Sequence, residues 1–104
     1  MKPKKFIIKR ITEGGLVQEH LVTVDLEDAY LLRNYIWAVH FSRKNNQGEL
    51  YWYVARRIDK IWEYLHQRVL GVTSGERIYH INHDTLDCRK ANLMRESQRI
   101  VELP

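Results

Sequence analysis

Residues 77–95 read RIYHINHDTLDCRKANLMR, and this stretch decides most of what the sequence predicts. It divides into β-prone Arg77 to Ile81, polar Asn82 to Lys90 and β-prone Asn92 to Arg95. Two short strands are therefore expected, with a long polar loop between them. His80 would lie near the end of the first strand, and Asn92 at the start of the second.

Short helices are expected on both sides of this strand pair. Tyr64 to Leu70 has helix-compatible spacing, and Gly71 follows it, as glycine commonly does at a helix C-terminus. Ser97 is placed to cap a final helix. That helix is expected to be short, because only about two turns fit before Pro104.

The N-terminal part, residues 1–63, is expected to be rich in β-strands. Lys5 to Thr12 and Leu16 to Val24 are β-prone runs on either side of the turn signal Glu13-Gly14-Gly15. This pattern predicts a hairpin at the start of the chain.

A short helix and a second hairpin are expected to follow. Asp25 is a candidate N-cap for the helix, which should end near Arg33 or Asn34. The sheet should then continue through Trp37 to Ser42, Leu50 to Arg57 and Ile61 to Glu63, with a polar tip over Arg43 to Gly48 and a turn at Asp59-Lys60. The aromatic residues of these strands are interpreted as core and sheet-face residues, namely Tyr51, Trp52, Tyr53 and Trp62.

The composition is that of one small globular domain. The chain has 104 residues, of which 44% are apolar and 29% are charged, enough for a single modest core. The predicted fold class is α+β, with β-hairpins in residues 1–63 and a second module in residues 64–101. Both modules are expected to belong to one domain spanning residues 1–104.

Features of secreted or membrane proteins are lacking in the sequence. Cys88 is the one cysteine and has no partner for an internal disulfide, and the apolar run Phe6 to Ile8 is too short for a secretion signal. No apolar run approaches membrane-spanning length. The expectation is an intracellular, cytoplasmic protein without a membrane partner.

The charge balance favours a polyanionic partner. Lys and Arg number 17 against 13 for Asp and Glu, so the formal net charge is +4. Such an excess favours binding to nucleic acid through the release of counterions, although an ordinary basic domain has the same composition.

Two segments resemble the HNH (His-Me finger, ββα-metal) homing-endonuclease family of phages and mobile introns. Tyr64 to Gly71 is similar to its Leu-His-Arg helix, and Ile78 to Leu93 to its strand ending in His, its Leu-Asp-Asn-Arg loop and its Asn-Leu pair. Upstream, Val24 to Asp28, Trp37 and Tyr53 to Arg56 follow the layout that commonly precedes this module. The resemblance implies a C-terminal ββα-metal finger and a protein that acts on DNA.

The resemblance also implies roles for individual residues. His80 would be the general base that activates water, and one Mg²⁺ or Mn²⁺ ion would stabilise charge on the scissile phosphate. Asn92 would fix the loop between the strands and orient His80 through hydrogen bonds of its amide. His66 would support the site, either by holding the first helix against the finger or by approaching the DNA backbone.

The usual metal-ligand positions of the family hold other residues here. They are Tyr79 and Val101, and two further departures are His83 in place of Gly and Cys88 in place of Asn. Substitute metal ligands would come from His83, Asp84, Glu96 or Glu102, of which the first two are the candidates closest to the motif. A zinc site formed by His66, His80, His83 and Cys88 matches no familiar spacing.

Basic residues cluster around the module and are candidates for binding phosphate. Arg89 and Lys90 lie inside the motif and are the first candidates, because guanidinium and ammonium groups position a duplex without reading its sequence. The other DNA-binding candidates are Arg56, Arg68 and Arg95, with Arg57, Lys60, Arg77 and Arg99 nearby in the sequence.

Two functions are therefore open. The first is a metal-dependent DNA endonuclease, phage-encoded or of a mobile element, that hydrolyses phosphodiester bonds with a His80-activated water. The second is a catalytically degenerate HNH fold that binds DNA or a protein, for example as an inhibitor of a host system. Tyr79 and Val101 motivate the second hypothesis.

Overall fold

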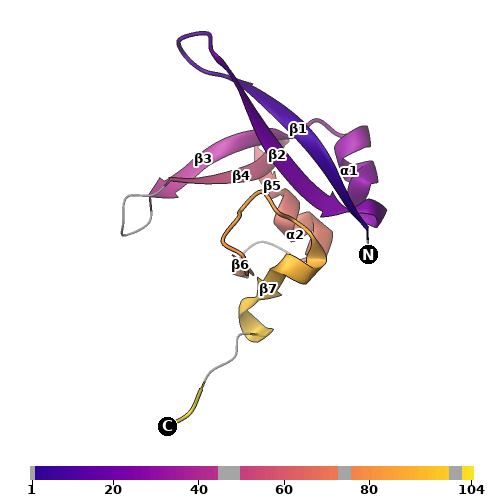
Figure 1. Cartoon of the computed structure of the whole chain (residues 1–104), viewed down its shortest axis with the longest axis vertical. Helices are drawn as coiled ribbons and strands as arrows, with labels where there is room; N and C mark the ends of the chain where they lie inside the picture. Colours follow the sequence, from indigo (N-terminus) through magenta and orange to yellow (C-terminus); the bar gives the residue numbers. More distant parts are fainter. Residues whose placement is uncertain (1, 45–49, 73–75, 99–101) are drawn as a thin grey trace.

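A long β-hairpin forms the N-terminal part of the molecule. The computed structural model describes residues 2–44, 50–72, 76–98 and 102–104. Strands β1 (Pro3–Ile11) and β2 (Val17–Asp25) pair antiparallel over their whole length, as predicted. The hydrogen bond from the Thr12 N–H to the Leu16 carbonyl, at 2.8 Å, closes the turn, and Gly15 has the positive φ of 83° that favours glycine. Figure 1 shows the closed end of this hairpin projecting from the rest of the molecule.

A second, three-stranded antiparallel sheet has the order β3 (Ala38–Lys44), β4 (Leu50–Ile58) and β5 (Ile61–Tyr64). Asp59 and Lys60 connect β4 to β5 as a two-residue turn with φ values of 49° and 69°. Such left-handed residues match the twist of the two strands they join. The three predicted strands are confirmed, while residues 45–49 of the expected polar tip lie outside the described residues.

The helices are short. A 3₁₀ turn, η1 (Leu26–Asp28), leads into α1 (Ala29–Asn34), which ends where the sequence predicted. α2 (Leu65–Leu70) also ends as predicted, because Gly71 adopts φ 68° and the N–H groups of Gly71 and Val72 bond the last carbonyls of the helix. Within the described part of the chain, no helix combines the length and the apolar character needed to cross a membrane.

The expectation that the Asp25 side chain caps the first helix is wrong. Asp25 is the last residue of β2, and its side chain makes no capping bond to η1. Its Oδ2 accepts a hydrogen bond from the backbone N–H of Lys90 at 3.0 Å instead. The carboxylate therefore ties the N-terminal part of the chain to the C-terminal loop.

The C-terminal module contains two short paired strands, β6 (Ile78–His80) and β7 (Leu93–Arg95), with the 3₁₀ turn η2 (Lys90–Asn92) before β7. Both strands are shorter than predicted. Asn92, which was expected to begin the second strand, belongs to the 3₁₀ turn before it. A further 3₁₀ turn, η3 (Glu96–Gln98), follows β7. Ser97 therefore lies inside a turn and does not cap an α-helix, and residues 99–101 of the expected final helix lie outside the described residues.

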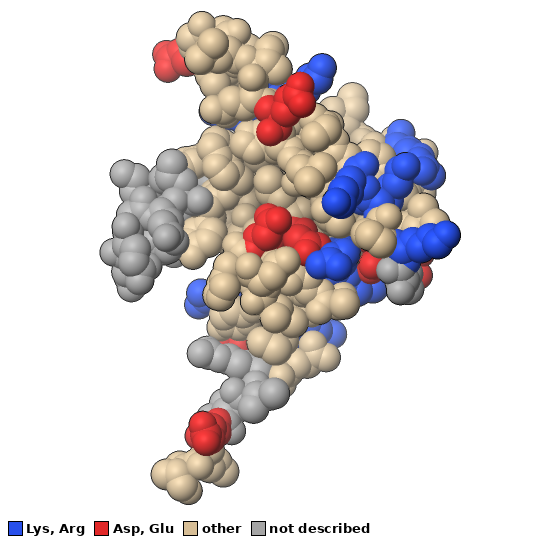
Figure 2. Space-filling model, in the orientation of Figure 1, with Lys and Arg blue, Asp and Glu red and all other residues tan. Residues whose placement is uncertain are grey.

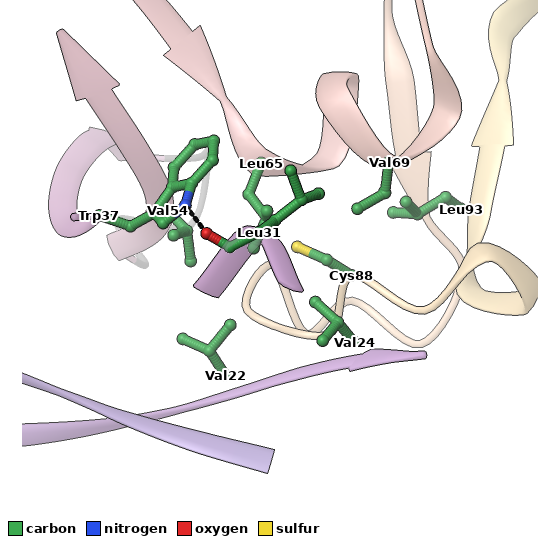
Figure 3. Packing of buried hydrophobic residues seen from close by; sticks show 9 residues of the cluster. All are labelled: Val22, Val24, Leu31, Trp37, Val54, Leu65, Val69, Cys88 and Leu93. Carbon is green, nitrogen blue, oxygen red and sulfur yellow. Dashed lines mark hydrogen bonds between the residues drawn. The ribbon is translucent and has the colours of Figure 1, made fainter. Parts of the chain in front are cut away.

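One hydrophobic core joins the two parts of the chain (Figure 3). It combines residues of β2, α1, β4, α2, the loop before η2, and β7: Val22, Val24, Leu31, Trp37, Val54, Leu65, Val69, Cys88 and Leu93. Trp37 precedes β3 rather than starting it, and its indole N–H donates to the Leu31 carbonyl at 2.9 Å. Burying each aliphatic side chain of this kind stabilises a fold by about 1.5–3 kcal/mol. The result is the small mixed α+β fold that the sequence predicted.

The polar loop between β6 and η2 is fastened to β2. The Thr23 N–H bonds the Leu86 carbonyl at 3.0 Å, and the Cys88 N–H bonds the Thr23 carbonyl at 2.7 Å, which forms a parallel bridge between Thr23 and Asp87. The Thr85 hydroxyl also donates to the Trp52 carbonyl on β4. The loop is therefore attached both to the β1–β2 hairpin and to the sheet of β3, β4 and β5.

Candidate functional site

His80 is the last residue of β6 and lies opposite Leu93 of β7. The Ile81 N–H bonds the Asn92 carbonyl at 2.8 Å, so the strand pair continues to the mouth of the loop. The His83 N–H then bonds the His80 carbonyl at 3.0 Å, which turns the chain sharply after the strand. The backbone around His80 is thus fixed on both sides by hydrogen bonds.

Asn92 closes the loop through its side chain. Its Oδ1 accepts the Asn82 N–H at 2.9 Å, and its Nδ2 donates to the Asp87 carbonyl at 2.9 Å. The side chain is only 5% exposed, so these bonds are shielded from water. The expectation that the amide bonds the His80 ring needs correction, because both amide atoms bind loop backbone and act on His80 through the chain that follows it.

The His80 ring is buried against a second histidine. The residue is 9% exposed, and its ring centroid lies 5.2 Å from that of His66 with the planes at 71°. Tyr53 of β4 lies beside both rings, at 6.3 Å from His80 and 5.6 Å from His66. The Nε2 atom of His80 and the Nδ1 atom of His66 are buried and have no hydrogen-bond partner.

Burial keeps both imidazoles uncharged at neutral pH. It lowers the pKa of His80, against the opposing attraction of Asp84 and Asp87. Burial, together with the smaller effect of the neighbouring His80, lowers the pKa of His66 to about 4. Because His66 is buried between α2 and β6, it holds the helix against the strand pair rather than approaching DNA from the surface.

The two proposed metal ligands of the loop are solvent-exposed. His83 has a φ of 65°, a left-handed conformation that favours glycine. Asp84 accepts the Leu86 N–H through Oδ1 at 3.0 Å, and its charge acts on His80. The zinc hypothesis for His66, His80, His83 and Cys88 is wrong, because the described residues form no such ligand group and Cys88 lies in the hydrophobic core.

A different acidic cluster exists, and a lysine occupies it. The described residues bring carboxylate oxygens of Asp25, Glu27 and Asp28 within 4.8 Å of one another. The Lys90 ammonium lies 2.6 Å from Glu27 and 2.8 Å from Asp28, while its backbone N–H binds Asp25. The negative charge of the cluster is therefore partly offset by a cation of the chain.

Tyr79, which stands at one usual metal-ligand position, is engaged elsewhere. Its hydroxyl donates to Glu96 at 3.4 Å, and Arg77 lies over its ring at 5.0 Å. Val101, at the other position, lies outside the described residues. Glu102 is exposed near the C-terminus, and among the described residues no three of the substitute ligands named from the sequence form a metal-binding group.

The cations predicted to bind phosphate are held by carboxylates of the chain. Arg89 makes a bidentate pair with Asp87, at 2.8 and 2.7 Å, and Arg95 makes one with Glu76, at 2.8 and 2.7 Å. Arg56 and Arg68 share Glu63, at 3.4 and 3.3 Å, and Lys90 binds Glu27 and Asp28. Arg56 also lies over the Tyr35 ring at 4.1 Å. These five side chains are therefore engaged in ion pairs that stabilise the fold in the absence of any ligand.

Sequence reasoning missed the residues that surround the two histidines. Tyr53 was assigned to the sheet face, yet it contacts both rings, and Tyr64 lies 5.5 Å from His66. The contact of Tyr64 with His66 could have been predicted, because the two residues are only two positions apart. The sequence contains no signal that predicts the contact between Tyr53 and His80. No family model, characterised protein or solved structure matches this chain.

Proposed function

We propose that this chain is an HNH-type, metal-dependent DNA endonuclease, of the kind carried by phages and mobile elements, with His80 as the general base. One observation carries the proposal: an uncharged imidazole ends a strand whose following loop is closed by a buried asparagine amide. A base must be unprotonated before it can take a proton from water, and the lowered pKa of His80 meets this condition at neutral pH.

The two ring nitrogens of His80 have different surroundings. Nε2 is buried and has no hydrogen-bond partner, so we assign to Nδ1 the removal of a proton from the attacking water. His66 and Tyr53 pack against the ring and limit its rotation. Asn92 holds the loop backbone, so the direction of the ring relative to the loop is maintained during the reaction.

Asp84 is the residue best suited to hold the divalent cation. Asp84 is exposed and directly follows the turn between His80 and His83. Its negative charge acts on the His80 imidazole. Mg²⁺ commonly binds through one or two carboxylates and completes its shell with water and substrate phosphates. When bound, it would supply positive charge to the scissile phosphate and the leaving oxygen.

Nicking of supercoiled plasmid tests the proposal. The native chain is expected to nick with Mg²⁺ or Mn²⁺ and to stop with a chelator, and His80→Ala and Asp84→Asn are each expected to lower the rate by about 100-fold or more. His40→Ala is the matched control, because His40 is half-buried on β3 and packs against Trp62. Thermal melts of every variant separate lost chemistry from lost folding. No cleavage by the folded native chain with any of several divalent metals would end the endonuclease proposal.

A second function, a non-catalytic DNA- or protein-binding module, is favoured by Tyr79. This phenol occupies a metal-ligand position of the family and is bonded to Glu96. A neutral phenol is a poor ligand for a hard cation. Under this function the native chain binds DNA or a protein without turnover, and His80→Ala leaves that binding unchanged. Turnover abolished by His80→Ala would exclude it.

A further inference from the structure

The lysines at the start of the chain are exposed. Lys2 and the β1 residues Lys4, Lys5 and Lys9 have exposed side chains. No ion pair between residues that the structure describes includes any of these lysines, in contrast to the five cations held by carboxylates, namely Arg56, Arg68, Arg89, Lys90 and Arg95. Figure 2 shows Lys and Arg side chains gathered on the side of the molecule where the N-terminus and α1 lie. The hairpin therefore carries exposed positive charge that the carboxylates of these ion pairs do not neutralise.

The two-stranded hairpin presents part of this charge on one face. Alternation along β1 puts Lys5, Ile7 and Lys9 on the same side, and Ile7 is 51% exposed. Its cross-strand partner Leu21 is 48% exposed on the same face. The opposite face carries Phe6 and Ile8, which pack against the core. The outer face thus combines two lysines with an apolar pair between them.

The dimensions of this face match duplex DNA. Lys5 and Lys9 are four residues apart, which in a strand corresponds to about 13 Å. The major groove of B-DNA is about 12 Å wide and admits a two-stranded β-ribbon. The lysines can therefore reach phosphates on the two sides of a groove, with Ile7 and Leu21 facing the groove between them.

We propose that the outer face of the β1–β2 hairpin, carrying Lys5 and Lys9, is the surface that binds the DNA backbone. The proposal deepens the proposed function, on which its choice of DNA rests. β2 is bonded through Thr23 to Leu86 and Cys88 of the loop that follows His80. A duplex held by the hairpin would therefore keep a constant position relative to His80.

Glu19 makes the proposal sharper. It is the cross-strand partner of Lys9 and is exposed on the same face. A carboxylate there repels phosphate, so its removal should tighten DNA binding. Lysines on edge strands often serve to prevent the strand from pairing with other chains. If this is the only role of the β1 lysines, removing the Glu19 carboxylate would not change the affinity for DNA.

Fluorescence anisotropy with a short labelled duplex tests the surface, in chelator so that no cleavage occurs. Lys5→Gln with Lys9→Gln is expected to weaken binding about tenfold at moderate salt and to lower the slope of log K against log salt by about two. Glu19→Gln should tighten binding several-fold. The matched control is Arg57→Gln with Lys60→Gln, which removes two exposed charges at the β4–β5 turn and should leave binding near that of the native chain.

Three outcomes overturn the proposal. They are equal affinity and salt slope for the hairpin and control double variants, an unchanged affinity of Glu19→Gln, and self-association of the hairpin variant in size-exclusion chromatography with unaltered DNA binding. Thermal melts confirm that each variant is folded. This assay contains no metal, so its result on the hairpin surface does not depend on plasmid nicking. Failure of the DNA-binding surface can therefore be distinguished from failure of the endonuclease proposal.

Discussion

His66 and His80 lie with their rings edge to face, 5.2 Å between centroids, in a buried position where a nitrogen of each has no hydrogen-bond partner. One histidine comes from α2 and the other from the end of β6. A proton on either ring would be poorly solvated and would repel a proton on the other. The contact therefore joins helix to strand only while both imidazoles are neutral.

Acid should destabilise the fold through His66. Its pKa falls from the ordinary 6.5 to about 4 on folding, so the unfolded chain binds more protons between these values. The stability that the neutral ring supplies is complete above pH 6.5 and is lost as the pH falls toward 4, a total of about 3 kcal/mol at most. Urea unfolding at several pH values measures this loss.

His66→Phe is the control for that pH profile. Phe keeps an aromatic ring in the buried position without a titrating group, so the free energy of unfolding should vary less between pH 7 and pH 5 (roughly the titration range of histidine). A variant with the same acid sensitivity as the native chain would show that His66 does not cause the loss.

Asn92→Ala should destabilise the chain and loosen its loop. The substitution leaves the partly buried N–H of Asn82 and the buried carbonyl of Asp87 without their side-chain partner. Buried unpaired groups of this kind cost about 1–3 kcal/mol each. Urea denaturation measures the free energy, and hydrogen exchange of the Asn82 amide measures the local opening. Asn34→Ala, at the exposed end of α1, is the matched control. Unchanged exchange at Asn82 would contradict the role of the amide.

Lys90→Met should convert the acidic cluster into one that responds to cations. Without the ammonium group, Asp25, Glu27 and Asp28 repel one another, and the loss of stability is expected to be about 1–2 kcal/mol because Lys90 is partly exposed. Millimolar Ca²⁺ should then raise the melting temperature of this variant more than that of the native chain. Lys60→Met is the control, since Lys60 is exposed at the β4–β5 turn. Equal Ca²⁺ responses in both variants would show that the three carboxylates do not act together.

His83→Gly should stabilise the protein. The φ of 65° at His83 is unfavourable for a residue with a Cβ atom, and glycine removes that cost. The expected gain is about 0.5–1 kcal/mol, measured by urea unfolding, after the greater flexibility of glycine in the unfolded chain is allowed for. His83→Ala keeps the Cβ atom and should show no gain. If glycine and alanine have the same effect, the backbone at this position carries no strain.

Local features of the fold could be predicted from the sequence because they depend on neighbouring residues. Gly15 and Gly71 adopt the left-handed conformations expected of them, and the hairpin and the end of α2 follow. The order of strand, polar loop and strand between His80 and Asn92 was also predicted. Turn chemistry and β-propensity act over a few residues, so these elements need no knowledge of the rest of the chain.

Contacts between distant residues required the tertiary structure. Lys90 meets Glu27 and Asp28, more than sixty positions earlier, and Tyr53 meets His80 across two elements. No spacing rule reports such contacts, because they follow from how β2, β4 and α2 pack around one core. The sequence alone determined that the chain is basic and carries the strand, loop and strand of the His80 motif. Packing decided which positive charges form ion pairs with carboxylates of the chain and which, including Lys5 and Lys9 of β1, remain exposed, because these pairings depend on elements that are distant in the sequence.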